Sequence, residues 1–282
     1  MEQEERERLY QLSTPLLADA CMRLGIPVRC APSTLQALEA DMHCAGRVCP
    51  VRHAGSVDIF FEALEDAQPG DVLVIDNGGR TDHACVGDLV AREVQAAGLA
   101  GIVIWGLHRD TWQIHEIGLP FFSQGHIPTG PVKLDRRPAA DALAWARVGD
   151  WIVGKNDIVA ADRDGVIFLP SDDLAAIIEA GEAIKAAEER QAELLKEGKS
   201  LREQLKFKEY LAQHSVTPSY TFRDHLRQIG GAIDTILSVL LSGAGSMYNL
   251  ILFSPCLAFP DILWYYTHRA EDNITFGELY FS

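Results

Sequence analysis

Three charged residues in the middle of the chain, Asp88, Arg109 and Asp110, have the side chains that metal-assisted chemistry on a small oxo-acid needs. An arginine offers a planar fork that binds a carboxylate through two hydrogen bonds. One aspartate can hold a hard cation such as Mg²⁺, and a second can anchor a metal-bound water or carry a proton. With backbone N–H groups they would bind an α-oxo-acid and stabilise its enolate. The plainer alternative is that Arg109 and Asp110 are surface neighbours and that Asp88 only caps a helix.

The segments around these residues predict a β-α-β crossover. The pattern favours a buried strand over residues 71–76, a helix over 88–98 and a second strand over 101–105. A crossover of this length makes the two strands parallel, so Asp88 and the Arg109-Asp110 pair should meet at the carboxyl edge of the sheet, where ligands bind. The free N–H groups at the helix start suit an anion. The helix should bury Leu89, Val90, Val94 and Ala97, and the loop over 77–87 carries Gly78, Gly79 and Gly87.

The rest of the first 230 residues predicts further helices and strands. A helix is expected over 13–25, capped by Ser13 or Thr14 and closed by Gly25, and a second over 56–71 that ends before Pro69. Strands are expected over 44–53, with a proline at its edge, over PFFSQG (120–125) and GPVKLD (130–135), and as a pair over 151–170. From Ser171 to Leu205 the pattern predicts one long helix with most of its charges on one face.

Composition limits the classes of function. The 282 residues contain 25 Lys and Arg against 40 Asp and Glu, a net charge of −15, which argues against sequence-independent nucleic-acid binding. The first twelve residues are charged and lack the apolar core of a signal peptide, so a cytoplasmic location is expected. The six cysteines show no CxxC pair and are expected to be buried thiols. Cys44 and Cys49 near His43 and His53 fit no standard zinc spacing.

The last fifth of the chain differs from the rest in composition. From Thr235 to Pro260 the sequence contains no charged residue, and the length of this run meets the criterion for a membrane span. Two glycines, two prolines and four serines, with no basic flank, argue against such a span. The alternatives are a membrane or interfacial anchor, a packed or oligomer-contacting segment, and a non-native or poorly ordered tail, such as a shifted reading frame would give.

The run GDVLVIDNGG…GDLVAREVQAAGLAGIVIWGLHRD resembles the class II pyruvate aldolase and RraA-like family, whose signature is an Asp, twenty residues and then Arg-Asp. Here these are Asp88, residues 89–108 and Arg109-Asp110. LSTPLLADACMRLG, PFFSQGHIPTGP and DRDGVIFLP extend the resemblance over about residues 10–232. We therefore divide the chain into an RraA-like domain, 1–232, and an apolar C-terminal extension, 233–282.

The resemblance implies an α/β fold, a compact β/β/α sandwich of the swivelling-domain type with the crossover carrying the site, plus a C-terminal helical region. It implies homotrimers or homohexamers with sites at subunit contacts. Arg109 would bind the pyruvate carboxylate, Asp110 would ligate Mg²⁺ (or Mn²⁺) directly, and Asp88 would hold it through water. Gly79, Gly87, Asp88 and Leu89 would contact the substrate, since the loop from Gly79 to Gly87 wraps the oxo-acid in the family.

Some details depart from the family or stay open. Many members carry an aspartate before the glycine of the DG-x-x-RD motif, whereas this chain has Trp105, which would make one wall of the site apolar. His108 and His115 flank the site as candidate acids or bases, although a histidine in a loop is more often a packing residue. A neighbouring subunit would supply a carboxylate, for which the candidates are Glu188, Glu189 and Glu193.

The sequence therefore predicts a metal-dependent lyase that cleaves a 4-hydroxy-2-oxo acid, decarboxylates oxaloacetate, or does both, through a pyruvate enolate. A metal-bound water held by Asp88 is one candidate base. The rival hypothesis is a non-catalytic RraA-type regulator that binds a ribonuclease or another protein. A Schiff-base aldolase would need a lysine near the three residues, and there is none. A nucleotide-dependent methyltransferase is set aside because NGGRTDHACVG is not a G-x-G-x-x-G turn.

Overall fold

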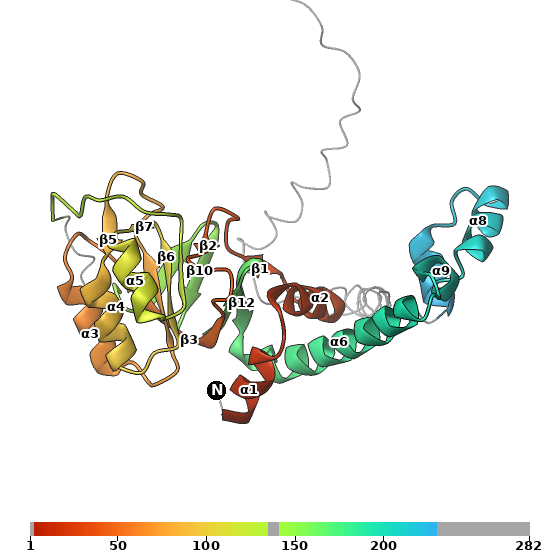
Figure 1. Cartoon of the computed structure of the whole chain (residues 1–282), viewed down its shortest axis with the longest axis horizontal. Helices are drawn as coiled ribbons and strands as arrows, with labels where there is room; N and C mark the ends of the chain where they lie inside the picture. Colours follow the sequence, from red (N-terminus) through yellow and green to blue (C-terminus); the bar gives the residue numbers. More distant parts are fainter. Residues whose placement is uncertain (1–2, 135–140, 230–282) are drawn as a thin grey trace, which may run out of the picture. The chain divides into compact units, whose positions relative to one another are not determined.

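The computed structural model describes residues 3–134 and 141–229. They form a mixed α/β fold built on an eight-stranded sheet with the strand order β1-β12-β11-β3-β4-β6-β8-β2 (Figure 1). The members of this sheet are β1 (Arg29–Cys30), β2 (Gln36–Ala37), β3 (Cys44–Arg52), β4 (Val72–Asp76), β6 (Gly101–Trp105), β8 (Phe121–Ser123), β11 (Asp157–Asp162) and β12 (Gly165–Pro170). Two small sheets pair β5 (Ala84–Val86) with β7 (Leu107–His108) and β9 (Trp145–Val148) with β10 (Trp151–Gly154).

The predicted crossover is confirmed. β4 and β6 pair in parallel, from Val72 opposite Gly101 to Asp76 opposite Trp105, and α4 (Asp88–Ala96) connects them. β3 lies on the other side of β4, also in parallel, and β8 lies on the far side of β6. The carboxyl ends of β3, β4 and β6 therefore share one edge of the sheet.

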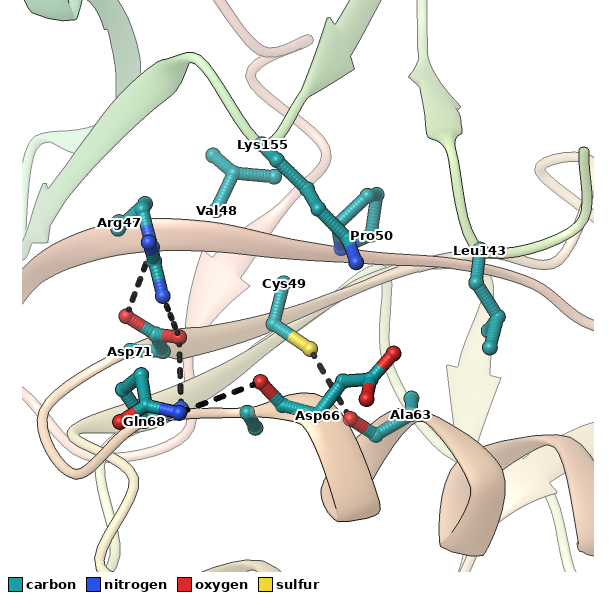
Figure 2. Close-up of a pocket in the computed structure, with 11 residues that line it drawn as sticks. Arg47, Val48, Cys49, Pro50, Ala63, Asp66, Gln68, Asp71, Leu143 and Lys155 are labelled. Carbon is teal, nitrogen blue, oxygen red and sulfur yellow. Dashed lines mark hydrogen bonds and ion pairs between the residues drawn. The ribbon is translucent and has the colours of Figure 1, made fainter.

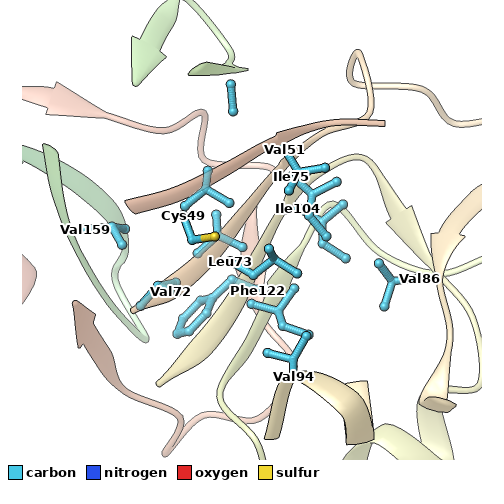
Figure 3. Close-up of a cluster of buried hydrophobic side chains, with 14 of the residues drawn as sticks. Cys49, Val51, Val72, Leu73, Ile75, Val86, Val94, Ile104, Phe122 and Val159 are labelled. Atoms are coloured by element: carbon cyan, nitrogen blue, oxygen red, sulfur yellow. The ribbon is translucent and has the colours of Figure 1, made fainter. Parts of the chain in front are cut away.

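The core around this crossover is apolar because both faces of the central strands are covered. Val72, Leu73, Val74 and Ile75 of β4 are fully buried, as are the residues of β6 from Ile102 to Ile104. Figure 3 shows Leu73, Ile104 and Val94 of α4 as members of one cluster of buried side chains. α3 (Asp58–Asp66) and α5 (Thr111–Ile117) contribute to the same cluster through Phe60 and Ile114.

The hairpin of β11 and β12 has two buried faces. Val159 and Phe168 belong to the central core, whereas the alternate residues Ile158 and Ile167 belong to a second cluster with α1, α2 and α6. These helices are α1 (Gln3–Tyr10), α2 (Thr14–Leu24) and α6 (Leu174–Lys196), which the short η1 (Ser171–Asp173) precedes. The alternation is the period of two that strands impose on their side chains.

Helix α2 confirms the predicted helix over 13–25, with Gly25 in the left-handed conformation (φ 70°) at its end. Ser13 makes no side-chain cap, and Asp162 takes this role by accepting hydrogen bonds from the N–H and hydroxyl of Thr14, both at 2.7 Å. The strand over 44–53 is also confirmed. Pro50 lies opposite Val74 of β4, and β11 pairs only with the first residues of β3, so no ladder bond needs the missing proline N–H.

Other expectations are wrong in part. The long helix ends at Lys196 because Gly198 turns to φ 91°, and Ser200 then caps α7 (Leu201–Gln204) in a capping box with Glu203. α8 (Phe207–Val216) and α9 (Phe222–Ile229) follow. The described part of GPVKLD, residues 130–134, is not a strand. The loop over 77–87 contains β5, and Leu89 is exposed rather than buried with the apolar face of its helix.

Four of the five described cysteines are buried as expected, and Cys30 is exposed. In residues 3–134 and 141–229, no helix has both the length and the apolar character needed to cross a membrane. The apolar extension predicted for residues 233–282, and the boundary proposed at residue 232, lie outside the described residues.

Candidate functional site

The predicted site is assembled by the short parallel pair β5 and β7. Ala84 lies opposite Leu107 and Val86 opposite His108, and the ladder continues with the Arg109 N–H, which donates to the Val86 carbonyl at 2.9 Å. This pairing places the segment after β7 beside the segment after β5. Arg109 and Asp110 are thereby held against Gly87 and Asp88, although twenty residues separate Asp88 from Arg109 in the chain.

Gly106 makes this arrangement possible. It separates β6 from β7 with φ 153°, and a β-carbon at this position would come within 2.8 Å of the Asn77 β-carbon. The backbone therefore crosses closely over the end of β4 before it joins β5, which only glycine permits.

Asp110 lies in a strained turn directly against Gly87. Its backbone has φ 61° and ψ 37°, the left-handed region that costs a residue with a side chain about 1–2 kcal/mol. A β-carbon at Gly87 would clash with Asp110 Oδ2, and the same oxygen lies 3.4 Å from the Asp88 N–H. The carboxylate of Asp110 thus lies at the N-terminus of α4, where free N–H groups favour negative charge.

The other two charged residues keep much of their bonding capacity. Arg109 approaches Asp110 only through its Nε, 3.5 Å from Oδ2, and half of its side chain is exposed. Asp88 begins α4 and faces Arg92 of the next turn at 3.9 Å. Gly130 approaches the Arg109 guanidinium from the loop after β8.

A cavity of about 240 Å³ opens between these residues and the end of β3. Five of the six predicted residues line it, namely Gly87, Asp88, Leu89, Arg109 and Asp110, together with His53, Gly55, Val57, Phe61, Ala84, Cys85, Val86, Val90 and Pro131. Its volume lies just below the roughly 300–1,000 Å³ typical of sites for drug-sized ligands, so it suits a small acid.

Gly79 and Trp105 lie elsewhere. A β-carbon at Gly79 would come within 2.8 Å of the Trp105 ring, and the Gly79 N–H donates to the Trp105 carbonyl at 3.1 Å. The two residues therefore pack on each other, and neither lines the cavity. The expectations that Gly79 contacts the substrate here and that Trp105 forms a wall of the site are not supported by this geometry.

His108 is a support for the site rather than a surface acid or base. It is buried, with Nδ1 2.8 Å from Ser123 Oγ and Nε2 3.1 Å from the hydroxyl of Thr111, the residue after Asp110. Burial, with a smaller contribution from nearby His126, lowers its pKa to about 4. The imidazole is therefore neutral near neutral pH and links β8 to the turn that carries Asp110.

The remaining predicted candidates lie away from the cavity. His115 is half-exposed and pairs with Glu39 at 2.9 Å. Glu188, Glu189 and Glu193 are exposed on α6, and the cavity lining includes none of them. Their suggested role in completing the site of another subunit stays a prediction.

Sequence reasoning missed the wall of the cavity that comes from β3 and α3. His53 directly follows β3, Val57 directly precedes α3, and Phe61 lies in the first turn of α3. No signal in the pattern around 44–53 pointed to this wall, because the pattern does not show that β3 pairs in parallel with β4 and ends at the same edge of the sheet.

A second cavity of about 410 Å³ lies beside the opposite end of β4 (Figure 2). Arg47 is bound there to Asp71 through two hydrogen bonds of 3.3 and 3.0 Å, and Lys155 extends toward Pro50. Burial chiefly raises the pKa of the Cys49 thiol to about 11, so this thiol is unreactive near neutral pH. The cavity contains none of the predicted site residues.

The donor set of the first cavity suits a hard divalent cation. Asp110 and Asp88 supply carboxylate oxygens, which Mg²⁺ prefers, and Mg²⁺ usually keeps several waters beside one or two carboxylates. The Asp110 carboxylate lies directly over the backbone of Gly87, so close that a β-carbon at this position would clash with it. Among residues 3–134 and 141–229, no three His, Cys, Asp or Glu side chains gather into a set that could hold a metal. Water and substrate would therefore have to fill most of the coordination positions.

The family model described as RraA-like (Aldolase/RraA) matches residues 14–168. A Hahella chejuensis protein named "Putative 4-hydroxy-4-methyl-2-oxoglutarate aldolase" is 30% identical over 157 residues, 56% of this chain and 92% of its own length. A Bacillus cereus protein of the same name is 31% identical over 123 residues, 44% of this chain and 76% of its own length.

Two solved structures share the fold. One, from Streptomyces coelicolor, is RraAS2, described as an unusual member of the RNase ES inhibitor RraA protein family; it is 28% identical with a TM-score of 0.60 and covers 67% of this chain and 96% of its own. The other, an uncharacterised Pseudomonas syringae protein, has a TM-score of 0.62 at 22% identity over 72% of this chain and 96% of its own, and supports the fold alone.

The mixed sheet and the helices packed on it define a mixed α/β protein. Within that class, the chain belongs to the RraA-like family, Aldolase/RraA.

Proposed function

We propose that this protein is a divalent-metal-dependent carbon–carbon lyase that cleaves a 4-hydroxy-2-oxo acid, decarboxylates oxaloacetate, or does both, through a pyruvate enolate. The observation that carries the proposal is the placement of Arg109, Asp110 and Asp88 on one cavity of about 240 Å³. The names of the Hahella chejuensis and Bacillus cereus relatives support a lyase that acts on 4-hydroxy-4-methyl-2-oxoglutarate.

Each residue has a defined task. Arg109 binds the carboxylate of the pyruvate half, because its exposed guanidinium has hydrogen-bond donors that Asp110 does not use. Asp110 would hold Mg²⁺ or Mn²⁺ directly and Asp88 would hold it through water, and the bound metal would polarise the 2-oxo group. The Asp88 N–H approaches Asp110, and the N–H groups that follow it at the start of α4 would stabilise the charge that develops on the enolate.

The reaction follows from this binding mode. In the retro-aldol direction a base accepts the proton of the C4 hydroxyl, the C3–C4 bond breaks, and its electron pair enters the enolate of pyruvate. In oxaloacetate the same enolate forms by loss of CO₂, with no hydroxyl proton to remove. Protonation at C3 gives pyruvate in both cases.

The family resemblance extends the proposal to assembly. A homotrimer or homohexamer in the cytoplasm would bring α6 of one subunit near the cavity of another, where Glu188, Glu189 or Glu193 would add a carboxylate. All three residues are exposed on α6. Light scattering of the purified full chain measures this state directly.

The test is pyruvate release by the purified full chain from oxaloacetate and from 4-hydroxy-4-methyl-2-oxoglutarate, with Mg²⁺ and with chelator. We expect metal-dependent release from at least one substrate and its loss in Asp110→Asn. Absence of release from both, in folded and assembled protein, contradicts the proposal.

The second candidate function is a non-catalytic regulator that binds a ribonuclease. It is favoured by the likeness to Streptomyces coelicolor RraAS2 and by the acidic composition of the chain. A regulator has no physical need for Asp88, Arg109 and Asp110 together on one cavity. A chain that binds a ribonuclease and releases no pyruvate would establish this alternative.

A further inference from the structure

The cavity that contains Arg109 and Asp110 has an apolar side, to which the proposed function gives no role. Three large apolar side chains line the cavity although much of each is exposed, namely Val57 (46%), Phe61 (47%) and Leu89 (76%). Single exposed apolar residues are common on protein surfaces, whereas several that gather on one concave surface mark a binding site. These three side chains therefore point to an apolar group on the ligand.

The start of α3 provides part of this apolar side. Val57 directly precedes the helix and Phe61 lies four residues later, so the two side chains lie on one face of its first turn. Phe60, the residue before Phe61, is fully buried in the core and fixes the side of the helix that packs on the sheet. Val57 and Phe61 are left outside the core, and both line the cavity.

The apolar side also replaces a feature that the sequence led us to expect at another residue. Trp105 was predicted to make one wall of the site apolar, but it packs on Gly79 and does not line the cavity. The chain thus keeps an apolar wall, which comes from α3 and α4 instead of from the end of β6.

The charged side chains of the cavity match one carboxylate of a ligand better than two. Arg109 is the one lysine or arginine among the described residues that line the cavity, and the proposed function assigns it to the carboxylate of the pyruvate half. Arg92 pairs with Asp88 at 3.9 Å and is not part of the lining. A second ligand carboxylate would lie against apolar side chains, where an uncompensated charge is unfavourable.

We propose that the substrate carries an uncharged apolar group on C4, and that Val57, Phe61 and Leu89 bind this group. The substrate class is a 4-hydroxy-2-oxo monocarboxylic acid with an alkyl or aryl substituent. It differs from 4-hydroxy-4-methyl-2-oxoglutarate, the compound in the names of the relatives, which has a carboxylate on C4. The proposal rests on the proposed lyase function and defines the substrate class of the same site.

The reaction is the retro-aldol cleavage already described, with a different leaving fragment. A base accepts the proton of the C4 hydroxyl, the C3–C4 bond breaks, and its electron pair enters the pyruvate enolate. C4 becomes the carbonyl carbon of an apolar aldehyde or ketone, and the enolate takes up a proton at C3 to give pyruvate.

The first test measures binding without turnover. The two oxo-acids 2-oxoglutarate and 5-methyl-2-oxohexanoate have no C4 hydroxyl and differ only in that an isopropyl group of similar shape replaces the second carboxylate. We expect the full chain with Mg²⁺ to bind 5-methyl-2-oxohexanoate at least about tenfold more tightly in isothermal calorimetry, because the second carboxylate would lose its water without gaining a partner.

The second test measures cleavage of the matching pair of substrates, 4-hydroxy-4-methyl-2-oxoglutarate and 4-hydroxy-4,5-dimethyl-2-oxohexanoate, both of which release pyruvate. The decisive quantity is the ratio of kcat/KM for the second substrate to that for the first. In Phe61→Arg this ratio should fall by about tenfold or more, because the new guanidinium can pair with the carboxylate on C4.

Two variants serve as matched controls. Phe61→Leu keeps an apolar side chain at the cavity and should preserve most of the ratio. Ile152→Arg adds the same charge at an exposed position of β10, outside the cavity, and should leave the ratio unchanged. The binding test uses the wild type, so it stays decisive if Phe61→Arg does not fold.

Equal or tighter binding of 2-oxoglutarate would overturn the substrate class while pyruvate release by the wild type stays. An unchanged ratio in folded Phe61→Arg would overturn the role of Phe61. If light scattering also showed an altered assembly of this variant, the apolar side chains would contact another subunit instead. Absence of pyruvate release from both hydroxy acids and from oxaloacetate would overturn the proposed lyase function, and the substrate class would fail with it.

Discussion

The protein has an arginine–aspartate pair at each end of β4, and the two pairs are built differently. Arg47 and Asp71 share two hydrogen bonds, and the Asp71 side chain is 6% exposed and also accepts from the Gln68 N–H at 3.0 Å. Arg109 and Asp110 approach at one point, 3.5 Å apart, and their side chains are 49% and 39% exposed. The first pair is satisfied within the protein, and the second retains donors and acceptors for a ligand.

The contrast shows why residue types alone do not identify a site. Both pairs border cavities, and the cavity beside Arg47 is the larger of the two. The Arg109–Asp110 pair differs from the Arg47–Asp71 pair in its unused hydrogen-bonding capacity and in the strained backbone of Asp110. Strain of this kind is retained where the surroundings hold it in place, and it is concentrated at functional sites.

The largest effect should come from exchanging one carboxylate in each pair for an amide. Asp110→Asn should lower kcat/KM for pyruvate release by about 10³-fold with little change in Tm, because the metal contributes several kcal/mol and asparagine tolerates the left-handed backbone. Asp71→Asn should leave kcat/KM near the wild-type value and lower the free energy of unfolding by about 2–3 kcal/mol. Steady-state kinetics and denaturant unfolding of both variants decide this, and the opposite pattern would refute the comparison.

The second effect is the pH dependence of stability that comes from the buried His108, the residue before Arg109. Because the pKa of folded His108 is about 4, below its ordinary 6.5, protonation favours the unfolded chain. The contribution of the neutral imidazole is complete above about pH 6.5 and is lost as the pH falls toward 4, on the order of 3 kcal/mol in total.

The measurement is the free energy of unfolding of the wild type and of His108→Gln across this range. The stability gap between them should narrow as the pH falls. A gap that stays constant from about pH 7 to about pH 4 would mean that the folded histidine titrates normally.

The third prediction tests the contact between Gly87 and Asp110. Gly87→Ala should lower kcat/KM by roughly 10–100-fold, because the new methyl group displaces the Asp110 carboxylate, while the backbone at residue 87 (φ −125°) accepts alanine without strain. Gly118→Ala is the matched control: its φ of 69° disfavours alanine, but no other atom lies within 4 Å of the added methyl. That variant should lose about 1 kcal/mol of stability and keep its activity.

The smallest effect should come from a third arginine–carboxylate pair, far from both cavities. Arg8 and Glu182 form a bidentate contact at 2.8 and 2.7 Å, with side chains about 40% exposed. Arg8→Gln should leave the free energy of unfolding almost unchanged, because solvent screens the pair. A loss as large as that of Asp71→Asn would show that the number of contacts, rather than burial, sets the contribution.

The crossover and its edge could be predicted from sequence because both depend on local patterns. β4, α4 and β6 each have a clear apolar period, and their lengths allow one topology. Five of the six predicted site residues consequently line one cavity.

The parts that were missed depend on contacts between distant segments. β5 has three residues and exists because β7 pairs with it, and Trp105 turns to Gly79 because Gly106 bends the chain. His53 joins the site only through the parallel pairing of β3 with β4. No window of sequence contains these partners together, so propensity could not reveal them.

The parallel pairing of β6 with β4 and of β7 with β5 also limits which insertions and deletions the protein can tolerate. The register of β6 is fixed by β4 from residue 101 onward, and that of β7 is fixed by β5 from residue 107 onward. A single codon inserted or deleted between residues 101 and 108 would therefore move Arg109 and Asp110 away from Gly87 unless a ladder broke. The length of this segment is therefore fixed by strand pairing on both sides, independently of the constraints on single residues such as Gly106.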